Sequence, residues 1–493
     1  MGAMTASSGI IGYGAYVPYF RLDRKAITAT LGQGGGRGTR AVASFDEDTT
    51  SMGVEAARNA LAGAGAGTGA ELGSLYFATA DPAYLDKTNA TAIHAALGLP
   101  QSTFAVDMGG AVRSGTGAIL AASDASRSTL VVLSDTRGGL AGGSDEGTGG
   151  DAAAALVFGT GSTGSTGSSG SSGSSAPVVC ELVAHASSTA EFLDRWRLPG
   201  AESSSMWEER FGEQEYVPLA HAAIADALKQ ATITVDQVTH LIVGGVHNRA
   251  VGVIAKTAGV GTGILADDLT SAIGNTGTPG TALVLCDVLD RAAAGDIIVQ
   301  VVASDGVDVL VWRATAALNA YRQARTAATV SAQIAGGNTT LSYPLYLTWK
   351  GQLRREPPRR PDPDRPSGPP SARMTEWKFG FNGSRCLACS TRHLPPMRVC
   401  VNCHAVDEMT PERLADVPAT IATFTIDRLA FSLSPPVVSA IIDFDGGGRF
   451  NCELTDMDPA EVQIGTRVQM TFRRILTGQG VHNYFWKAKP IRA

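Results

Sequence analysis

Two stretches of the chain repeat one order of elements, and this repeat constrains the fold more than any other feature. The segment SLYFATADP at residues 74–82 predicts a strand that runs into a loop, and HLIVGGVHN at residues 240–248 has the same pattern. Helices of small residues follow each of them, and further strands are expected at residues 128–136 and 295–313. Two halves of alternating strands and helices favour paired sheets with helices between and outside them.

The stretch AVDMGGAVRSGTGAIL at residues 105–120 joins a short apolar run to a glycine-rich turn and a helix of small residues. Such a turn presents one side chain at a helix start, where unpaired N–H groups and the positive end of the helix stabilise a thiolate. An acyl-transfer enzyme uses such a place for its nucleophile. Here the turn presents Val112, Arg113 and Ser114, and it contains no cysteine.

This turn resembles the nucleophile turn of the thiolase superfamily, and in detail that of the hydroxymethylglutaryl-CoA synthases, with the family's cysteine at Val112. The opening GIIGYGAYVPYFRLDR at residues 9–24 also resembles the first strand of the archaeal-type synthases. The resemblance covers roughly residues 8–345. It implies an α/β protein of the five-layer αβαβα thiolase fold with two similar halves, a CoA thioester as substrate, and a homodimer.

In these synthases a cysteine carries the acetyl group, a glutamate acts as general acid and base, and a histidine with an asparagine binds the thioester. The family's cysteine and glutamate positions hold Val112 and Ala80. The histidine position falls near Gly245, with His247 two residues later. The asparagine positions hold Asn248 and, in the motif IGNTG, Asn275.

Because a valine cannot be acylated, we expect no ping-pong Claisen chemistry through this site; Ser114 is the alternative nucleophile, but no base is evident beside it in the sequence. An aldol or retro-aldol reaction on a CoA thioester needs only a base and an oxyanion hole for the enolate. The candidate bases are His247, Asp81 and Asp107, and the oxyanion donors are Asn275 and the N–H groups from Gly110 to Val112. The expected substrate-binding residues are Asn248, Gly110, Ala111 and Ser114.

Each candidate also has a structural interpretation. His247 can be a hydrogen-bonded structural histidine, Asp81 and Asp107 can cap turns or helices, and Ser114 can be a packing residue. Asp135, Arg137, Asp194 and Arg197 match the family's frame, but they can form structural ion pairs. The second hypothesis is therefore a non-catalytic subunit that binds acyl-CoA or scaffolds a partner thiolase, hydratase or dehydrogenase.

The last third of the chain has a different composition. Residues 346–373 are rich in proline and arginine and predict an extended linker after the thiolase-like domain at 1–345. Two CxxC pairs follow, which predict one structural zinc ion in a zinc ribbon at 374–405. The ligands are Cys386, Cys389, Cys400 and Cys403.

Alternating segments separated by turns predict a small antiparallel OB barrel at residues 406–493. From about Arg373 to the end the chain resembles the zinc-ribbon and OB-fold proteins called DUF35, which accompany acyl-CoA thiolases. Basic and aromatic residues near the end can also serve a nucleic-acid groove. They are Arg473, Arg474, Tyr484, Phe485 and Trp486. The favoured role is docking on the thiolase-like domain, where the barrel covers or extends the acyl-CoA channel.

Charge and hydropathy exclude other classes of protein. The formal net charge of −6 provides no cationic field for nucleic acid. We find no apolar run of about 18 residues and no signal peptide, so we expect no membrane span and a cytoplasmic location.

The run at residues 159–175 holds only glycine, serine and threonine, and we expect it to be a flexible surface loop.

Overall fold

The computed structural model describes residues 7–64, 72–161, 176–259, 261–359, 361 and 363–492. Most of the glycine/serine-rich insertion predicted as a surface loop, residues 162–175, lies outside the described residues. Among the described helices, none is long and apolar enough to cross a membrane.

One nine-stranded mixed sheet is built from two halves that meet at β1 and β8. The first half contains β1 (Ser7–Tyr16), β4 (Ser74–Thr79), β5 (Phe104–Gly109), β6 (Thr129–Asp135) and β7 (Ala152–Gly161). The second half contains β8 (Cys180–Ser188), β11 (His240–Gly245), β12 (Ile297–Ala303) and β13 (Val307–Ala314). Their order is β11-β12-β13-β8-β1-β7-β6-β4-β5, and β1 pairs with β8 through only two residue pairs. The strands predicted from the sequence repeat are confirmed.

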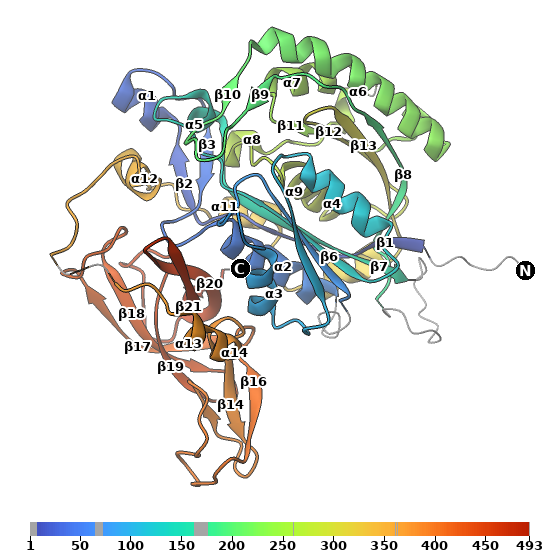
Figure 1. Ribbon diagram of the computed structural model, residues 1–493. Helices are drawn as coiled ribbons and strands as arrows, with labels where there is room; N and C mark the ends of the chain where they lie inside the picture. Colours follow the sequence, from blue (N-terminus) through green and yellow to red (C-terminus); the bar gives the residue numbers. More distant parts are fainter. Residues whose placement is uncertain are drawn as a thin grey trace, which may run out of the picture.

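Helices lie between and outside the two halves, as Figure 1 shows. The middle layer holds α4 (Ser114–Ser123) and α9 (Gly280–Leu289), and α9 contacts both β1 and β7 of one half and β11 and β12 of the other. The outer layers hold α2 (Thr49–Ala64) and α3 (Ala90–Leu97) on one side, and α6 (Glu209–Ala231) and α7 (Asn248–Thr257) on the other. This arrangement confirms the predicted five-layer αβαβα fold.

Small residues allow these layers to pack closely. A Cβ atom added to Gly12 of β1 would lie 2.6 Å from the Cβ of Ala64 and 2.8 Å from the carbonyl oxygen of Ala60, both in α2. Real Cβ atoms do not approach other atoms so closely, so α2 can lie on β1 only where β1 has no side chain.

Shorter elements complete this part of the chain. They are β2 (Phe20–Asp23), α1 (Lys25–Leu31), β3 (Thr39–Val42), α5 (Ser144–Thr148), β9 (Arg195–Trp196), β10 (Ser205–Met206), α8 (Thr270–Ile273), α10 (Leu318–Ala324), α11 (Val330–Ala335) and α12 (Tyr343–Trp349), with 3-10 turns at Val235–Gln237 and Thr262–Ile264.

The segment expected to be an extended linker, residues 346–373, is partly helical. Helix α12 runs past residue 345, and α13 (Gly368–Arg373) precedes α14 (Thr375–Lys378). Prolines in the first turn of α13 explain why a proline-rich segment can still start a helix, because the first N–H groups of a helix have no partner within it. The domain boundaries themselves stay predictions.

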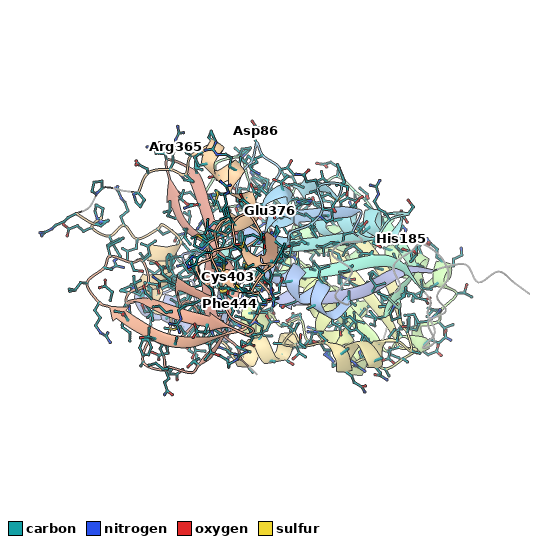
Figure 2. The ribbon with its side chains drawn as sticks, turned by 90° about the horizontal axis from the view of Figure 1, so that it is seen from below. Asp86, His185, Arg365, Glu376, Cys403 and Phe444 are labelled. Atoms are coloured by element: carbon teal, nitrogen blue, oxygen red, sulfur yellow. The ribbon has the colours of Figure 1, made fainter. Side chains whose placement is uncertain are left out.

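The C-terminal part contains two small sheets. One holds β14 (Asn382–Cys386), β15 (Arg392–His393) and β16 (Met409–Arg413) beside the four cysteines. The other has the order β19-β18-β17-β20-β21 and holds β17 (Ala419–Asp427), β18 (Val437–Phe444), β19 (Arg449–Glu453), β20 (Arg467–Gly478) and β21 (Val481–Pro490). Seen from below, Cys403 and Phe444 of this part lie near the middle of the view, and His185 of β8 lies to their right (Figure 2).

The OB barrel docks on α2, away from the helices of the middle layer. A single apolar cluster continues from Met52 and Ala56 of α2 to Phe472 and Trp486 of the barrel. The guanidinium of Arg58 in α2 lies 5.2 Å from the ring centre of Trp486.

Buried ion pairs fix this contact. Arg473 of β20 has no exposed side-chain surface, and its Nη1 lies 2.6 Å from Oε1 of Glu47. Lys487 Nζ lies 2.8 Å from Oδ2 of Asp46, and Lys489 Nζ lies 2.6 Å from Oε2 of Glu55. Arg473, Tyr484 and Trp486, which were considered for a nucleic-acid groove, are buried in the molecule. These three side chains are therefore not part of an exposed groove.

Candidate functional site

The turn after β5 places Val112 at the start of α4, as the sequence predicts. Gly110 has φ +110°, a backbone conformation that side chains disfavour, so glycine is required where the chain leaves the strand. Val112 is 8% exposed and lines a cavity. Its N–H group stands before the first helical turn and has no acceptor among the described residues.

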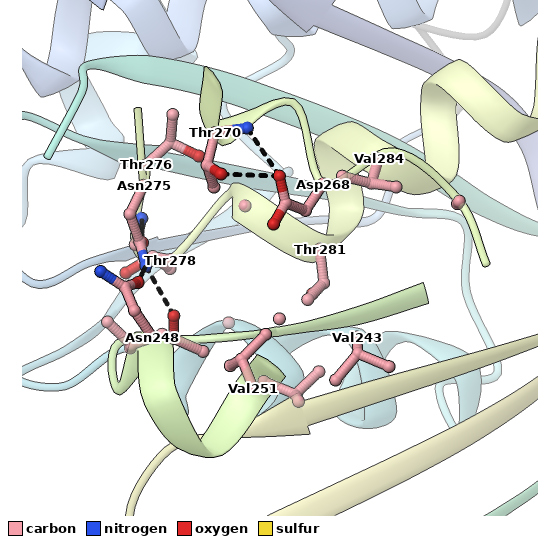
Figure 3. Close-up of a pocket in the computed structure, with 18 of the residues that line it drawn as sticks. Val243, Asn248, Val251, Asp268, Thr270, Asn275, Thr276, Thr278, Thr281 and Val284 are labelled. Atoms are coloured by element: carbon pink, nitrogen blue, oxygen red, sulfur yellow. Dashed lines mark hydrogen bonds between the residues drawn. The ribbon is translucent and has the colours of Figure 1, made fainter. Parts of the chain in front are cut away.

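The cavity has a volume of about 320 Å³ and lies between α4, α7 and the segment at residues 274–281 (Figure 3). Its lining combines apolar side chains with amide, hydroxyl and charged groups. The lining residues used below are Val112, Gly245, Asn248, Lys256, Asp268, Asn275, Gly277 and Thr278. No residue of the C-terminal part belongs to the described lining. The expectation that the barrel covers this cavity is therefore wrong.

Asn275 has a fixed position in the cavity wall. Its backbone N–H donates to Thr148, and its carbonyl accepts from Gly150. Its side-chain Nδ2 donates to the carbonyl of Gly245 at 2.7 Å and to Oδ1 of Asn248 at 3.2 Å. The structure therefore brings together the two predicted asparagines and Val112.

His247 does not belong to the cavity lining. Its Nδ1 accepts a hydrogen bond from the N–H of Ala250 at 3.1 Å, so it caps the start of α7. Its ring lies against Gly212 of α6, and its centre is 5.9 Å from that of Tyr216. The residue that faces the cavity at the end of β11 is Gly245, which has no side chain.

The two predicted aspartates also lie outside the lining. Asp107 accepts hydrogen bonds from the backbone N–H groups of Asn89 and Ala90, and it thereby holds the start of α3. Asp81 accepts from the hydroxyl of Thr136 and lies 3.7 Å from Arg197. The contacts of Asp107 match its structural interpretation as a helix cap, whereas the Asp81 carboxylate contacts a threonine hydroxyl and an arginine.

The remaining turn residues frame the start of α4. Ser114 Oγ donates to the carbonyl of Gly109, and Gly110 donates its N–H to Thr79. Gly110, Ala111 and Ser114 are not among the residues that line the cavity.

Asp135 ties two loops of the site together. Oδ1 of this buried carboxylate accepts from Thr79 Oγ1 and from the N–H of Ala80, and Oδ2 accepts from the N–H and hydroxyl of Thr278. Burial raises the pKa of Asp135, while the nearby charge of Arg137 and the hydrogen bonds oppose that rise. The Asp135 carboxylate therefore binds both Ala80 and the cavity residue Thr278 through hydrogen bonds.

The lining includes one carboxylate that sequence reasoning missed. Asp268 precedes α8, and its Oδ1 accepts from the N–H of Thr270 at 2.9 Å and from its hydroxyl at 2.6 Å. Figure 3 shows the other oxygen of Asp268 without a bond to the residues drawn. The pattern Asp-Leu-Thr predicts an Asx turn, but nothing local in the sequence indicates that this turn faces Asn275.

The four predicted cysteines meet at one point. Their Sγ atoms all lie within 4.8 Å of one another; the Cys386–Cys403 separation is 3.6 Å and the Cys389–Cys400 separation is 3.5 Å. Four thiolates about 2.3 Å from one ion are separated by somewhat under 4 Å, so these positions fit one tetrahedral metal. N–H groups of Asn402 and Cys403 point at Cys400 Sγ, as a metal-binding knuckle requires.

Similar proteins are known for both parts of the chain. Over 303 residues it is 30% identical to the hydroxymethylglutaryl-CoA synthase of Aeropyrum pernix, a match that covers 59% of this chain and 80% of that one. Over 126 residues it is 32% identical to a DUF35 domain-containing scaffold protein of Methanocaldococcus jannaschii, covering 24% and 89%. Residues 412–473 match the family model of the C-terminal OB-fold domain of ChsH2.

Solved structures share the fold of the first part. MvaS in complex with 3-hydroxy-3-methylglutaryl coenzyme A superposes with a TM-score of 0.56 at 19% identity, covering 73% of this chain and 96% of that one. The 3-oxoacyl-(acyl carrier protein) synthase III FabH from Pseudomonas aeruginosa gives 0.52 at 18% identity, covering 63% and 98%. Both are neighbours of the thiolase-like fold.

Proposed function

Because the chain belongs to the hydroxymethylglutaryl-CoA synthase family, with a tail related to the DUF35 proteins, we propose that it acts on a CoA thioester without forming an acyl-enzyme. The observation that carries this proposal is the start of α4. There the family's nucleophile position holds Val112 inside the cavity, while the N–H group of the same residue remains without a described acceptor. A backbone N–H serves as an oxyanion donor whatever the side chain is.

The reaction we propose is an aldol or retro-aldol step at the carbon next to the thioester carbonyl. Removing a proton from this carbon moves negative charge onto the carbonyl oxygen, which the N–H of Val112 and the amide of Asn275 would stabilise. For Asn275 this requires exchanging its 3.2 Å hydrogen bond to Asn248 for one to the substrate.

Asp268 is our candidate for the base, in place of the three residues expected from the sequence. It is the carboxylate in the described lining, and only its Oδ1 is engaged by Thr270. His247 is held as the cap of α7, and its removal should affect the stability of that helix more than the chemistry.

The test is hydrogen–deuterium exchange at the α carbon of a panel of short, branched and steroidal acyl-CoA thioesters, followed by mass spectrometry. We expect exchange with the parent protein, its loss in Asp268→Asn, and its retention in His247→Gln. Loss only in His247→Gln would return the role of base to that residue. Exchange that both variants retain would exclude both as bases.

A non-catalytic acyl-CoA-binding subunit is the second candidate. Ala80 and Gly245 favour it, because neither residue has a group that can move a proton, and so does the engagement of both Asn275 N–H donors. Exposed Leu387 and Val401 beside the four cysteines would then contact a partner acyl-CoA enzyme. Binding of CoA thioesters without any α exchange would support this function.

We also propose that the four cysteines hold one structural zinc ion, since four thiolates leave no position for a substrate. Such reduced thiols suit the cytoplasm.

A homodimer is proposed through β5, which is the edge strand of the nine-stranded sheet and exposes 54% of Phe104. Pairing two copies of this strand would satisfy its free backbone groups.

A further inference from the structure

We propose that the buried contact between the OB barrel and the thiolase-like part is a pH-sensitive switch, in which the carboxylates around Arg473 hold one proton and the barrel is bound less tightly once this proton is lost. The switch lies outside the cavity, and it does not depend on the reaction proposed there. The charged side chains that form it are called here the joint cluster. Its members are Asp46, Glu47, Glu453, Asp456, Arg473 and Lys487.

Three buried carboxylates surround the guanidinium of Arg473 in β20. Its Nη1 lies 2.6 Å from Oε1 of Glu47 and 3.6 Å from Oδ1 of Asp46, and its Nη2 contacts Oδ2 of Asp456. Each of these four side chains exposes at most 2% of its surface. One buried guanidinium therefore faces three carboxylates that solvent does not reach.

A second cation reduces this excess of negative charge but does not cancel it. Lys487 Nζ lies 2.8 Å from Oδ2 of Asp46 and 2.8 Å from Oε2 of Glu453, whose side chain is 49% exposed. Within the joint cluster, two cations therefore contact four carboxylates. An unbalanced charge in the interior costs free energy, and a proton bound to one of the carboxylates lowers that cost.

The charged side chains around the joint cluster have partners of their own. They form the pairs Lys489–Glu55, Arg58–Glu55 and Arg474–Asp48. Among the described residues, none of these three cations forms an ion pair with a member of the cluster. Arg21 is a further cation near Glu47, but its guanidinium donates to backbone carbonyls and acts on Glu47 only through space. Even with Arg21 included, three cations face four carboxylates.

The surroundings of Glu47 shift its protonation toward neutral pH. Its Oε1 accepts a hydrogen bond from the hydroxyl of Tyr16 at 2.5 Å, and its Oε2 accepts from the N–H of Ser44 at 2.8 Å. Burial raises the pKa of Glu47 to about 7 from 4.5, against the opposing charge of Arg473 and with a contribution from the negative charge of Asp456. Glu47 therefore gains a proton at a pH where an exposed glutamate is ionised.

The neighbouring aspartates differ from each other. Burial would raise the pKa of Asp46, but Lys487 and Arg473 reverse this effect and lower it to about 2, so Asp46 stays ionised. Asp456 has one engaged oxygen, and its Oδ1 has no hydrogen-bond partner within the described part of the chain. The proton is therefore held between Glu47 and Asp456, which share the guanidinium of Arg473.

This proton stabilises the docked barrel, because the pKa of Glu47 is higher in the folded protein than in the unfolded chain. The stabilisation is complete below about pH 4.5 and is lost as the pH rises through about 7. Across this range each pH unit raises the equilibrium constant for opening the contact by roughly tenfold, up to a total of roughly three hundredfold. Above this range the constant levels off.

The experiment compares urea unfolding of the full chain and of Glu47→Gln between pH 5 and pH 8, followed by tryptophan fluorescence. Glutamine resembles the protonated carboxyl group and cannot ionise. We expect the unfolding constant of the parent protein to rise between these pH values by roughly fiftyfold to a hundredfold more than that of the variant. Burial lowers the pKa of His482, which has the opposite pH dependence, but both proteins retain this histidine and the comparison cancels its effect.

The matched control is Glu55→Gln. Its carboxylate has a pKa of about 2 and is ionised throughout this range, so the variant should be less stable by the same factor at pH 5 and pH 8. Infrared spectra give a readout that does not depend on unfolding. The carbonyl band of a protonated carboxyl group should be present in the parent protein at pH 5, weaken as the pH rises to 8, and be lost from Glu47→Gln.

Two results would overturn the inference. Parallel pH profiles, with Glu47→Gln less stable than the parent protein by one factor at every pH, would show that Glu47 is ionised throughout and forms an ordinary ion pair. An infrared band that Glu47→Gln retains in full would also overturn it. If that variant does not fold, Asp456→Asn should remove the same band, because it removes one of the carboxylates that share Arg473, and retention of the band there would have the same consequence.

Discussion

Replacing Glu55 by glutamine tests whether buried charges hold the OB barrel on the thiolase-like part. Glu55 lies in α2, where its side chain is 7% exposed and contacts Arg58 and Lys489 at 2.9 and 2.6 Å. Burial alone would raise its pKa, but Lys489, followed by Arg58, reverses this effect and lowers the pKa to about 2 from 4.5. At about 1.4 kcal/mol for each pKa unit, the ionised carboxylate stabilises the folded state by roughly 3 kcal/mol at pH 7.

The effect has a defined dependence on pH. The pKa of Glu55 is lower in the folded state than in the unfolded state, so its stabilisation is complete above about pH 4.5 and is lost as the pH falls through about 2. Glutamine resembles the protonated carboxyl and leaves Lys489 buried without a counter-charge. We therefore expect Glu55→Gln to lose roughly 3 kcal/mol at pH 7 and about half of that at pH 3.

The assay is thermal and urea unfolding of both proteins at pH 7 and pH 3, followed by tryptophan fluorescence and circular dichroism. Asp443→Asn is the control, because Asp443 pairs with Arg449 at the exposed surface and should change stability by less than about 1 kcal/mol. A loss in Glu55→Gln that is equally large at both pH values would refute the electrostatic reasoning, since packing alone would then explain it. A loss below about 1 kcal/mol at pH 7 would also refute it.

Other predictions concern the metal, the helix start and the sheet edge. Cys403→Ser should lower the zinc content from one ion per chain to none and destabilise the ribbon, measured by elemental analysis and limited proteolysis; an unchanged content would contradict the four-cysteine site. Val112→Cys should become acetylated once by acetyl-CoA yet catalyse no turnover, because Ala80 and Gly245 supply no acid or base; intact-mass measurements that show no adduct would contradict the placement of the thioester at α4. Phe104→Lys should convert the proposed dimer into monomers in analytical ultracentrifugation, and a parent protein that is already monomeric would exclude that dimer.

Some of the site could be predicted because the chemistry is local in the sequence. Two CxxC pairs place four thiolates on two knuckles. The turn from Gly110 to Val112 leads into α4 because of its own residues and not because of contacts with distant parts of the chain. Asn275 belongs to the glycine-rich motif IGNTG, which predicts a site residue there, and it lines the cavity in the structure.

Other residues depended on contacts with distant parts of the chain. His247 follows a strand, as a catalytic residue would, but Gly212 in α6 leaves room for its ring on the side away from the cavity. Asp268 looks like an ordinary turn residue, and only the tertiary structure, which brings the segment before α8 into one lining with Asn248 of α7, places it at the cavity. Arg473 looks like part of a cationic groove until Glu47, more than 400 positions earlier, is found beside it.

The sequence by itself determined the order of elements, the metal ligands and the absence of a nucleophile at Val112, because hydrophobic periodicity and motif spacing are properties of neighbouring residues. The tertiary structure alone decided which polar groups share a cavity and which face of the barrel is buried. A side chain's solvent exposure and its charged neighbours are set by long-range packing, and these determine whether an arginine such as Arg473 is paired in the interior or exposed to solvent.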